Sequence, residues 1–168
     1  MIGDKIELVE FGADVGDQPE DSGHGVILFT IGSEYFALPL EDIAEIHRTE
    51  EITPLPLAPE FLLGVINVHG ILSSVIHIAK IMNVSGDEES ELLIRLIPER
   101  GGISLMVGAT MGMARYSFLE EVTREISDRT GQVTFVEGIF RSGERLVSLI
   151  NPEKLRVWID AAFSKGEL

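Results

Sequence analysis

The sequence contains no cysteine among its 168 residues. This absence excludes disulfides, thiolate zinc sites and a cysteine nucleophile. Basic residues are also scarce, with 13 Lys and Arg against 28 Asp and Glu, which gives a formal net charge of −15. Nucleic acids and anionic membrane surfaces are bound through clustered Lys and Arg, so this charge would repel them. We therefore expect neither nucleic acid nor a membrane surface as a partner.

Long apolar runs are missing as well. The longest, Phe61–Val68, is interrupted by Gly64 and Asn67 and is far shorter than the ~20 residues that span a bilayer. The first 25 residues carry seven acids and one base, unlike the basic start of a secretory signal. These features predict a soluble intracellular protein without direct membrane insertion, in which residues 1–25 form an acidic flexible arm.

What the sequence does contain is a series of short, β-branched apolar runs separated by turn residues. They predict four hairpins, 26–31 with 35–40, 63–68 with 71–76, 92–98 with 103–107, and 133–140 with 145–150. Further strands are expected at 52–55 and 110–116, and short helices at 41–48 and 77–83. A C-terminal helix should begin after Asn151, because Asn is a strong N-cap and Pro152 suits the first helical position.

The spacing of these elements predicts the fold class. Turn signals at intervals of roughly 8–12 residues favour barrels or sandwiches over alternating strands and helices. We expect a mainly β protein made of two similar modules, divided near residue 87, with residues 161–168 as a tail.

Residues that could carry catalysis do not converge. The Gly-rich segments match no phosphate-binding loop, and Ser73-Ser74 lacks the spacing of a nucleophile elbow. His69 and His77 are eight residues apart and have no third metal ligand at a recognisable spacing. We predict no catalytic residue, no metal site and no cofactor, and therefore not an enzyme.

One connection is unusually apolar for a loop. The segment 54–64, PLPLAPEFLLG, combines rigid Pro with several Leu and Phe residues in a connection that should be exposed. Exposed apolar surface of this kind often marks a partner interface. The alternative is that Leu55, Leu57 and Phe61 cover the ends of the barrels, and the sequence does not decide between the two.

Residues 52–70, ITPLPLAPEFLLGVINVHG, resemble the CheW family of chemotaxis coupling proteins. The family has a Pro-containing stretch, a Phe and then a Gly-Val-x-Asn-Leu-Arg-Gly core. Residues 26–38 are similar to its opening hairpin and 42–46 to its short helix, while 136–139 and 146–150 are similar to its closing hairpin. The resemblance covers residues 26–160, which we take as a CheW-like domain.

The resemblance implies a fold and a function. The fold would be two small five-stranded β-barrels, SH3-like or OB-like, packed around a shared hydrophobic region, with short helices and a C-terminal helix. The function would be that of a non-enzymatic cytoplasmic adaptor, recruited to receptor arrays, that couples chemoreceptors to a CheA-type histidine kinase. By the same resemblance, the kinase-facing residues are Ile52, Gly64, Asn67, His69 and Gly70, and the receptor-facing residues are Ile43, Glu45 and Ile46.

The sequence also departs from the family pattern. Charges typical of the family are missing at His69, His77, Ala79 and Gly108, and His69 replaces a permanently charged Arg. These changes bear on affinity for a standard kinase rather than on the fold. Two alternatives stay open, a small-molecule-binding β-barrel sensor with an apolar groove between its modules and a divergent adaptor in a pathway unrelated to motility.

Overall fold

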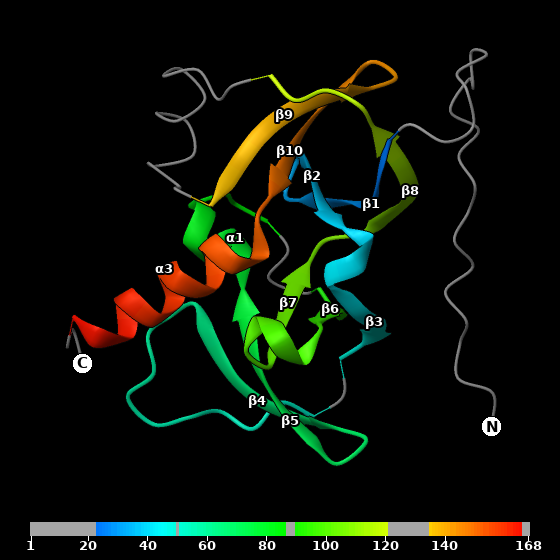
Figure 1. Ribbon diagram of the computed structural model, residues 1–168. Helices are drawn as coiled ribbons and strands as arrows, with labels where there is room; N and C mark the ends of the chain where they lie inside the picture. The colour runs from blue at the N-terminus through cyan, green and yellow to red at the C-terminus, as the bar shows by residue number, and fades with distance from the viewer. Residues whose placement is uncertain (1–22, 50, 87–89, 121–134, 166–168) are drawn as a thin grey trace.

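The computed structural model describes residues 23–49, 51–86, 90–120 and 135–165. Within these ranges the chain forms ten strands, arranged in two five-stranded sheets (Figure 1). All four predicted hairpins are present as antiparallel strand pairs. The mainly β fold with two five-stranded units is therefore confirmed. The predicted acidic arm lies almost wholly outside the described residues, of which only 23–25 belong to it.

The first sheet is built from the two ends of the described chain. Its strands are β1 (His24–Ile31), β2 (Glu34–Pro39), β8 (Thr110–Tyr116), β9 (Val136–Ser142) and β10 (Arg145–Ile150). They lie in the order β8-β1-β2-β10-β9, and only the β10–β2 pair is parallel. This sheet occupies the upper half of Figure 1.

The second sheet is inserted between β2 and β8. Its strands are β3 (Ile43–Arg48), β4 (Leu62–Val68), β5 (Ile71–His77), β6 (Leu92–Leu96) and β7 (Ile103–Val107), in the order β3-β6-β7-β5-β4. Strands from both sides of residue 87 thus share this sheet. The expected division near that residue does not coincide with a boundary between the sheets, because β1 and β2 pair with strands that follow β7.

The sheets are open at their edges rather than closed into barrels. Among the described residues no ladder joins β8 to β9 or β3 to β4. Two isolated bridges lie on outer strands instead, Glu120 with Ile139 of β9 and Thr53 with Val65 of β4. The strand predicted at 52–55 is reduced to this single bridge at Thr53.

Short helices connect successive strands, and the longest helix lies at the end of the described chain. They are η1 (Leu40–Asp42), α1 (Ile78–Met82), η2 (Pro98–Arg100) and α3 (Pro152–Ser164). As predicted, Asn151 caps α3, and its side-chain oxygen accepts a hydrogen bond from the Lys154 N–H at 3.1 Å. The helix predicted at 77–83 is confirmed as α1. Helix α3 extends to Ser164, and thus includes the first four residues of the tail expected at 161–168.

The helix predicted at 41–48 is wrong. Only Leu40–Asp42 is helical, and Ile43–Arg48 forms strand β3. A bulge between Ile43 and Glu45 shifts the alternation of side chains, so Ile43 and Ile46 both face the core although they are three residues apart. In a helix the same spacing would also place both residues on one face, which is why the pattern indicated the wrong element.

One hydrophobic core is shared by both sheets. The first sheet contributes side chains such as Phe29 and Phe36, and the second contributes Ile94 and Leu105. Helices α1 and α3 pack on the same core, with Leu155 of α3 fully buried. The shared core holds the two sheets together and leaves the outer strands of each sheet at the surface.

Candidate partner-binding surfaces

Strand β4 is an outer strand that carries one of the close backbone contacts of the fold. Thr53 and Val65 exchange two main-chain hydrogen bonds of 2.9 Å each, which fastens the 52–61 connection to the strand. At Gly64, φ is +145°, and a Cβ atom there would lie 2.1 Å from the Thr53 carbonyl oxygen. Only glycine fits this contact, because no real Cβ approaches an oxygen so closely. Gly64 is thus required for the shape of this edge.

Ile52 is held in place by the same contact. Its side chain is partly buried and packs against the cluster formed by Ile66, Val68, Val75, Leu93 and Met106 on one face of the second sheet. A Cβ at Gly64 would also meet Ile52 Cγ2, at 2.9 Å. Ile52 and Gly64, which the resemblance assigns to the kinase-facing surface, are therefore neighbours in the structure.

The β4–β5 hairpin ends in a two-residue turn of His69 and Gly70. Both residues have positive φ, +53° at His69 and +83° at Gly70, as in the tight turns that match the twist of a hairpin. The Asn67 side-chain oxygen accepts a hydrogen bond from the Gly70 N–H at 2.8 Å. Asn67, His69 and Gly70 are all exposed, so the structure brings these three predicted residues together at an accessible tip.

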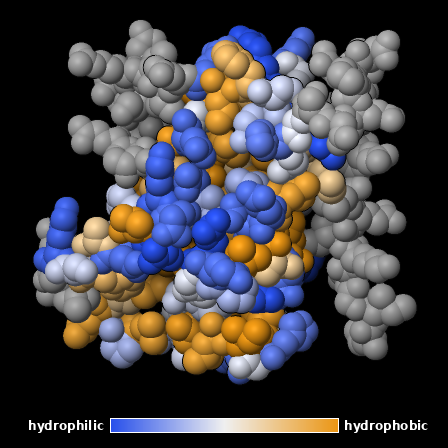
Figure 2. All heavy atoms as spheres, viewed as in Figure 1, coloured by the Kyte–Doolittle hydropathy of each residue, from blue (hydrophilic) through white to orange (hydrophobic). Residues whose placement is uncertain are grey.

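Large apolar side chains are exposed in both the β4–β5 hairpin and the 52–61 connection, Ile71 and Leu72 in the first and Leu55 and Leu57 in the second, and we call these four residues the apolar patch. Leu57 is 82% exposed and Leu72 is 67% exposed. Figure 2 shows apolar residues gathered along the lower edge of the view, where Figure 1 has the β4–β5 hairpin and the 52–61 connection. Leu55 and Leu57 thus do not cover the end of a barrel, and the exposure favours an interface.

Ile71 and Leu72 were not among the surface residues predicted from the sequence. Consecutive residues of a strand point to opposite faces, and at the start of β5 neither of them is buried. An apolar pair does not by itself indicate surface, because the consecutive Leu93 and Ile94 of β6 are both fully buried. The exposure of Ile71 and Leu72 therefore needed the structure.

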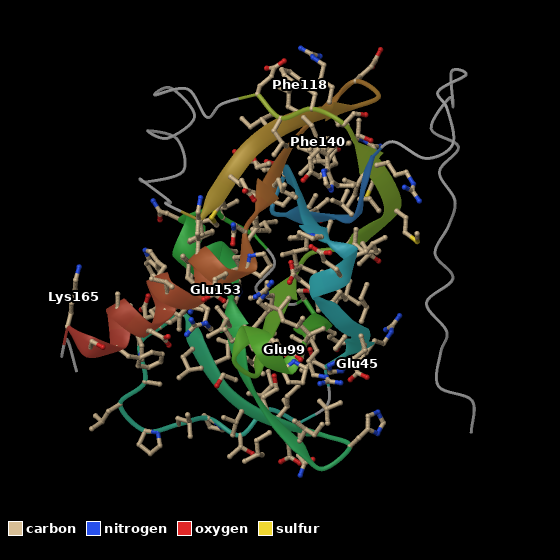
Figure 3. The ribbon with its side chains drawn as sticks, in the orientation of Figure 1. Glu45, Glu99, Phe118, Phe140, Glu153 and Lys165 are labelled. Carbon is tan, nitrogen blue, oxygen red and sulfur yellow. The ribbon has the colours of Figure 1, made fainter. Side chains whose placement is uncertain are left out.

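The predicted receptor-facing residues lie on β3, the opposite outer strand of the second sheet. Ile43 and Ile46 are partly buried against the shared core, whereas Glu45 points to the other face. Glu45 pairs across the strands with Arg95 of β6, whose Nε lies 3.1 Å from the carboxylate, and His47 Nε2 lies 4.0 Å from the same oxygen. Figure 3 shows Glu45 beside β3. This edge is therefore charged where the β4 edge is apolar.

The four positions that lack the family's charges differ in exposure. His77 and Ala79 are buried at the start of α1, and Gly108 is partly buried and donates its N–H to the Thr30 carbonyl at 2.8 Å. His69 is the exposed member of the set. The loss that changes the accessible surface most is therefore the loss at His69.

The described part of the chain contains no group of three or more His, Cys, Asp or Glu side chains placed to hold a metal ion. None of the helices described is both long and apolar enough to cross a membrane.

The shared core, the two outer strands and the exposed apolar patch are the features of a β-sheet protein-interaction module. The sequence model of the CheW family, described as the CheW-like domain, matches residues 25–158. The chain therefore belongs to the CheW family of chemotaxis proteins.

Individual relatives agree with this assignment. The chain is 25% identical over 131 residues to the chemotaxis protein CheW of Thermotoga maritima, a match that covers 77% of this chain and 85% of the relative. It is 26% identical over 138 residues to the probable chemotaxis protein CheW of Rhizobium etli, with the same coverage. Among solved structures, the scaffolding protein TtCheW from Thermoanaerobacter tengcongensis matches with a TM-score of 0.66 and 24% identity, over 77% of this chain and 89% of that one. This last likeness concerns the fold.

Proposed function

We propose that this protein is a non-enzymatic adaptor that holds a CheA-type histidine kinase and a chemoreceptor together in the cytoplasm, at receptor arrays. Membership of the CheW family supports the adaptor role. The observation that carries the proposal is the apolar patch, because Ile71 and Leu72 are exposed directly after the turn of His69 and Gly70, and Leu57 is exposed in the connection that is bonded to β4.

The kinase would bind along the β4 edge, through Ile52, Gly64, Asn67, His69 and Gly70. Between residues 52 and 76 the only Asp, Glu, Lys or Arg is Glu60, so this surface is nearly uncharged. Apolar surface that is removed from water on binding contributes about 25 cal/mol per Å² before the costs of association. Leu57 and Leu72 are the side chains with most area to bury. They should therefore dominate the affinity.

The receptor would bind along the β3 edge, near Ile43, Glu45 and Ile46. In the strand order of the second sheet, β3 and β4 are separated by β6, β7 and β5. The two outer strands are thus four positions apart in the strand order, and the residues proposed for the two partners do not overlap. Both partners could then bind at once, and the sheet between them would transmit relative position without any chemical step.

The proposal is tested by calorimetry with the full chain, the histidine kinase and the cytoplasmic receptor fragment encoded in the same genome. Leu72→Glu should weaken kinase binding at least about tenfold, because it replaces a highly exposed apolar side chain of the apolar patch with a charge. Met113→Glu is the matched control, since Met113 is 57% exposed on β8 of the other sheet. Binding of neither protein would contradict the proposal, and so would equal effects of the two substitutions.

A second variant restores the positive charge that the family has at the position of His69. His69→Arg should strengthen binding to a typical CheA, because Arg supplies a permanent cation with five donors at the exposed tip. Unchanged or weaker affinity would argue against the β4 edge as the kinase-facing surface.

A further inference from the structure

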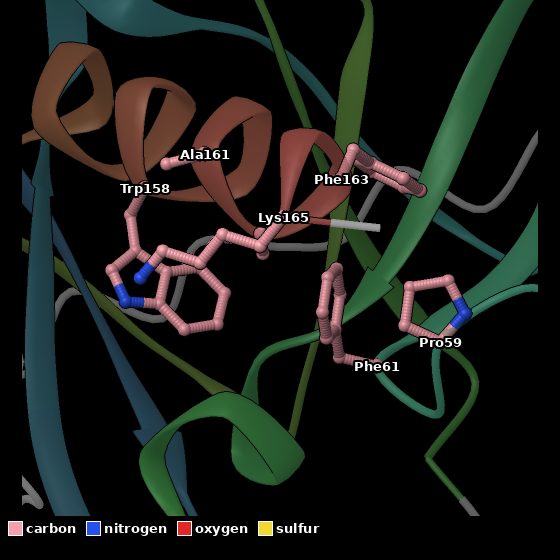
Figure 4. A pocket seen from close by; sticks show the side chains of 7 residues that line it. Pro59, Phe61, Trp158, Ala161, Phe163 and Lys165 are labelled. Carbon is pink, nitrogen blue, oxygen red and sulfur yellow. The ribbon is translucent and has the colours of Figure 1, made fainter. Parts of the chain in front are cut away.

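A pocket of about 330 Å³ lies between the last turns of α3 and the segment that precedes β4 (Figure 4). Its lining includes Pro59, Phe61, Trp158, Ala161, Phe163 and Lys165. The volume is within the range of pockets that bind small molecules, which are mostly apolar with a few polar groups that fix orientation. The pocket shares the 52–61 connection with the β4 edge, but none of the residues proposed to face the kinase or the receptor lines it.

The walls of the pocket are aromatic. The ring of Phe61 meets Trp158 edge-on with a centroid distance of 5.5 Å, and it meets Phe163 edge-on at 6.0 Å. Trp158, Ala161 and Lys165 follow one face of α3 at helical spacing, and the small side chain of Ala161 leaves room between the larger ones. Three rings around this space favour a flat hydrocarbon body, because aromatic groups prefer such edge and offset contacts.

Lys165 is the one ionisable residue in the lining of the pocket. The described residues place no carboxylate within ion-pair distance of it, whereas Arg156 of the same helix lies 2.6 Å from Glu153 and 2.8 Å from Asp160. Figure 4 shows the Lys165 side chain running toward the indole of Trp158. An ammonium group beside apolar walls favours an anion that can form a charge-assisted hydrogen bond.

We propose that this pocket binds a small aromatic carboxylate, with its ring among Phe61, Trp158 and Phe163 and its carboxylate on the Lys165 ammonium. The site goes beyond the adaptor role and does not depend on it. It would give the protein a ligand-binding site of its own at the C-terminal end of α3.

The full chain carries its own probe for this site, because Trp158 is the only tryptophan. Titration with 3-phenylpropionate should change the Trp158 fluorescence saturably, and calorimetry should give the same affinity. The uncharged 3-phenylpropanol should bind at least about threefold more weakly, since it lacks the ion pair, which corresponds to roughly 0.65 kcal/mol. No binding tighter than about 1 mM, or equal affinity for the acid and the alcohol, would overturn the proposal.

Three variants locate the binding. Lys165→Gln should remove the preference for the acid over the alcohol, and Ala161→Leu should weaken both ligands because it fills the pocket. Lys154→Gln is the matched control, since Lys154 is an exposed lysine of α3 outside the pocket. If Lys154→Gln weakens the acid as much as Lys165→Gln does, the assignment of the carboxylate to Lys165 is wrong.

Discussion

The two outer strands of the second sheet present different chemistry. The β4 edge is apolar and is shaped by the backbone, through the close contact at Gly64 and the positive φ of His69 and Gly70. The β3 edge is shaped by side chains. Glu45 forms an ion pair with Arg95 on one face of the strand, and Ile43 and Ile46 pack against the core on the other. One rigid sheet can therefore carry two surfaces that respond to different perturbations. The β4 edge should be sensitive to any side chain added at Gly64. The β3 edge should be sensitive to loss of a charge and to salt concentration.

The largest effect is expected for Gly64→Ala. The added Cβ would lie 2.1 Å from the Thr53 carbonyl oxygen, so the bridge between Thr53 and Val65 must break. We expect the free energy of unfolding to fall by about 2–4 kcal/mol, measured by urea titration, and kinase binding to be lost. Gly143→Ala is the control, because Gly143 also has positive φ (+61°) but nothing within 4 Å of its Cβ position. Equal losses for the two variants would show that the contact at Gly64 is not the cause.

A smaller effect is expected on the β3 edge. Glu45→Gln leaves the Arg95 guanidinium, whose side chain is 13% exposed, without its carboxylate. Stability should fall by about 1–2 kcal/mol, and less at high salt, because a partly buried charge loses its partner. The matched control is Glu91→Gln, which removes the exposed pair with Arg48 at 3.9 Å and should change stability by less than about 0.5 kcal/mol. Equal losses of stability in Glu45→Gln and Glu91→Gln would show that the pair of Glu45 with Arg95 is no stronger than the exposed pair of Glu91 with Arg48.

The turn at the tip of the β4 edge should respond modestly. His69 has φ of +53°, a conformation that Asn adopts easily and that β-branched residues avoid. We expect His69→Asn to raise the free energy of unfolding by about 0.5 kcal/mol and His69→Val to lower it by about 1 kcal/mol. The reverse order of stability in urea titrations would mean that the turn geometry is different.

The smallest effect concerns acid pH and lies outside both edges. The hydrogen bond from Arg156 lowers the pKa of Glu153 below its usual 4.5. A lowered folded-state pKa gives stability that is present above pH 4.5 and is lost as the pH falls through the folded pKa. Glu153→Gln should therefore flatten the pH dependence of stability below pH 4.5 in acid titrations. An unchanged pH dependence in the Glu153→Gln variant would remove the assignment to Glu153.

The local elements of the fold could be predicted from the sequence, but the long-range contacts could not. Each hairpin combines alternation with a turn such as His69-Gly70, and α3 has its N-cap at Asn151, so local residues determine these elements. The bulge at Ile43–Glu45 depends on pairing with β6, and no local pattern separates it from a helix. The pairing of β1 with β8 spans the whole second sheet.

The same difference applies to the candidate surfaces. The resemblance pointed to Ile52, Gly64 and His69, but the reason why Gly64 must be glycine is the approach of Thr53, which only the folded chain shows. Arg95 was missed as the partner of Glu45 because β3 and β6 are distant in sequence. Residues on one hairpin could thus be grouped from the sequence, whereas contacts between distant segments needed the structure.

We propose that the β4 and β3 edges of the second sheet bind the kinase and the receptor at the same time. The most direct test is a calorimetric titration of the kinase into the full chain, alone and saturated with the receptor fragment. Two independent edges predict kinase affinities that agree within about threefold, which is a coupling below roughly 0.7 kcal/mol. Loss of kinase binding in the presence of the receptor fragment would show a single shared surface and contradict the account.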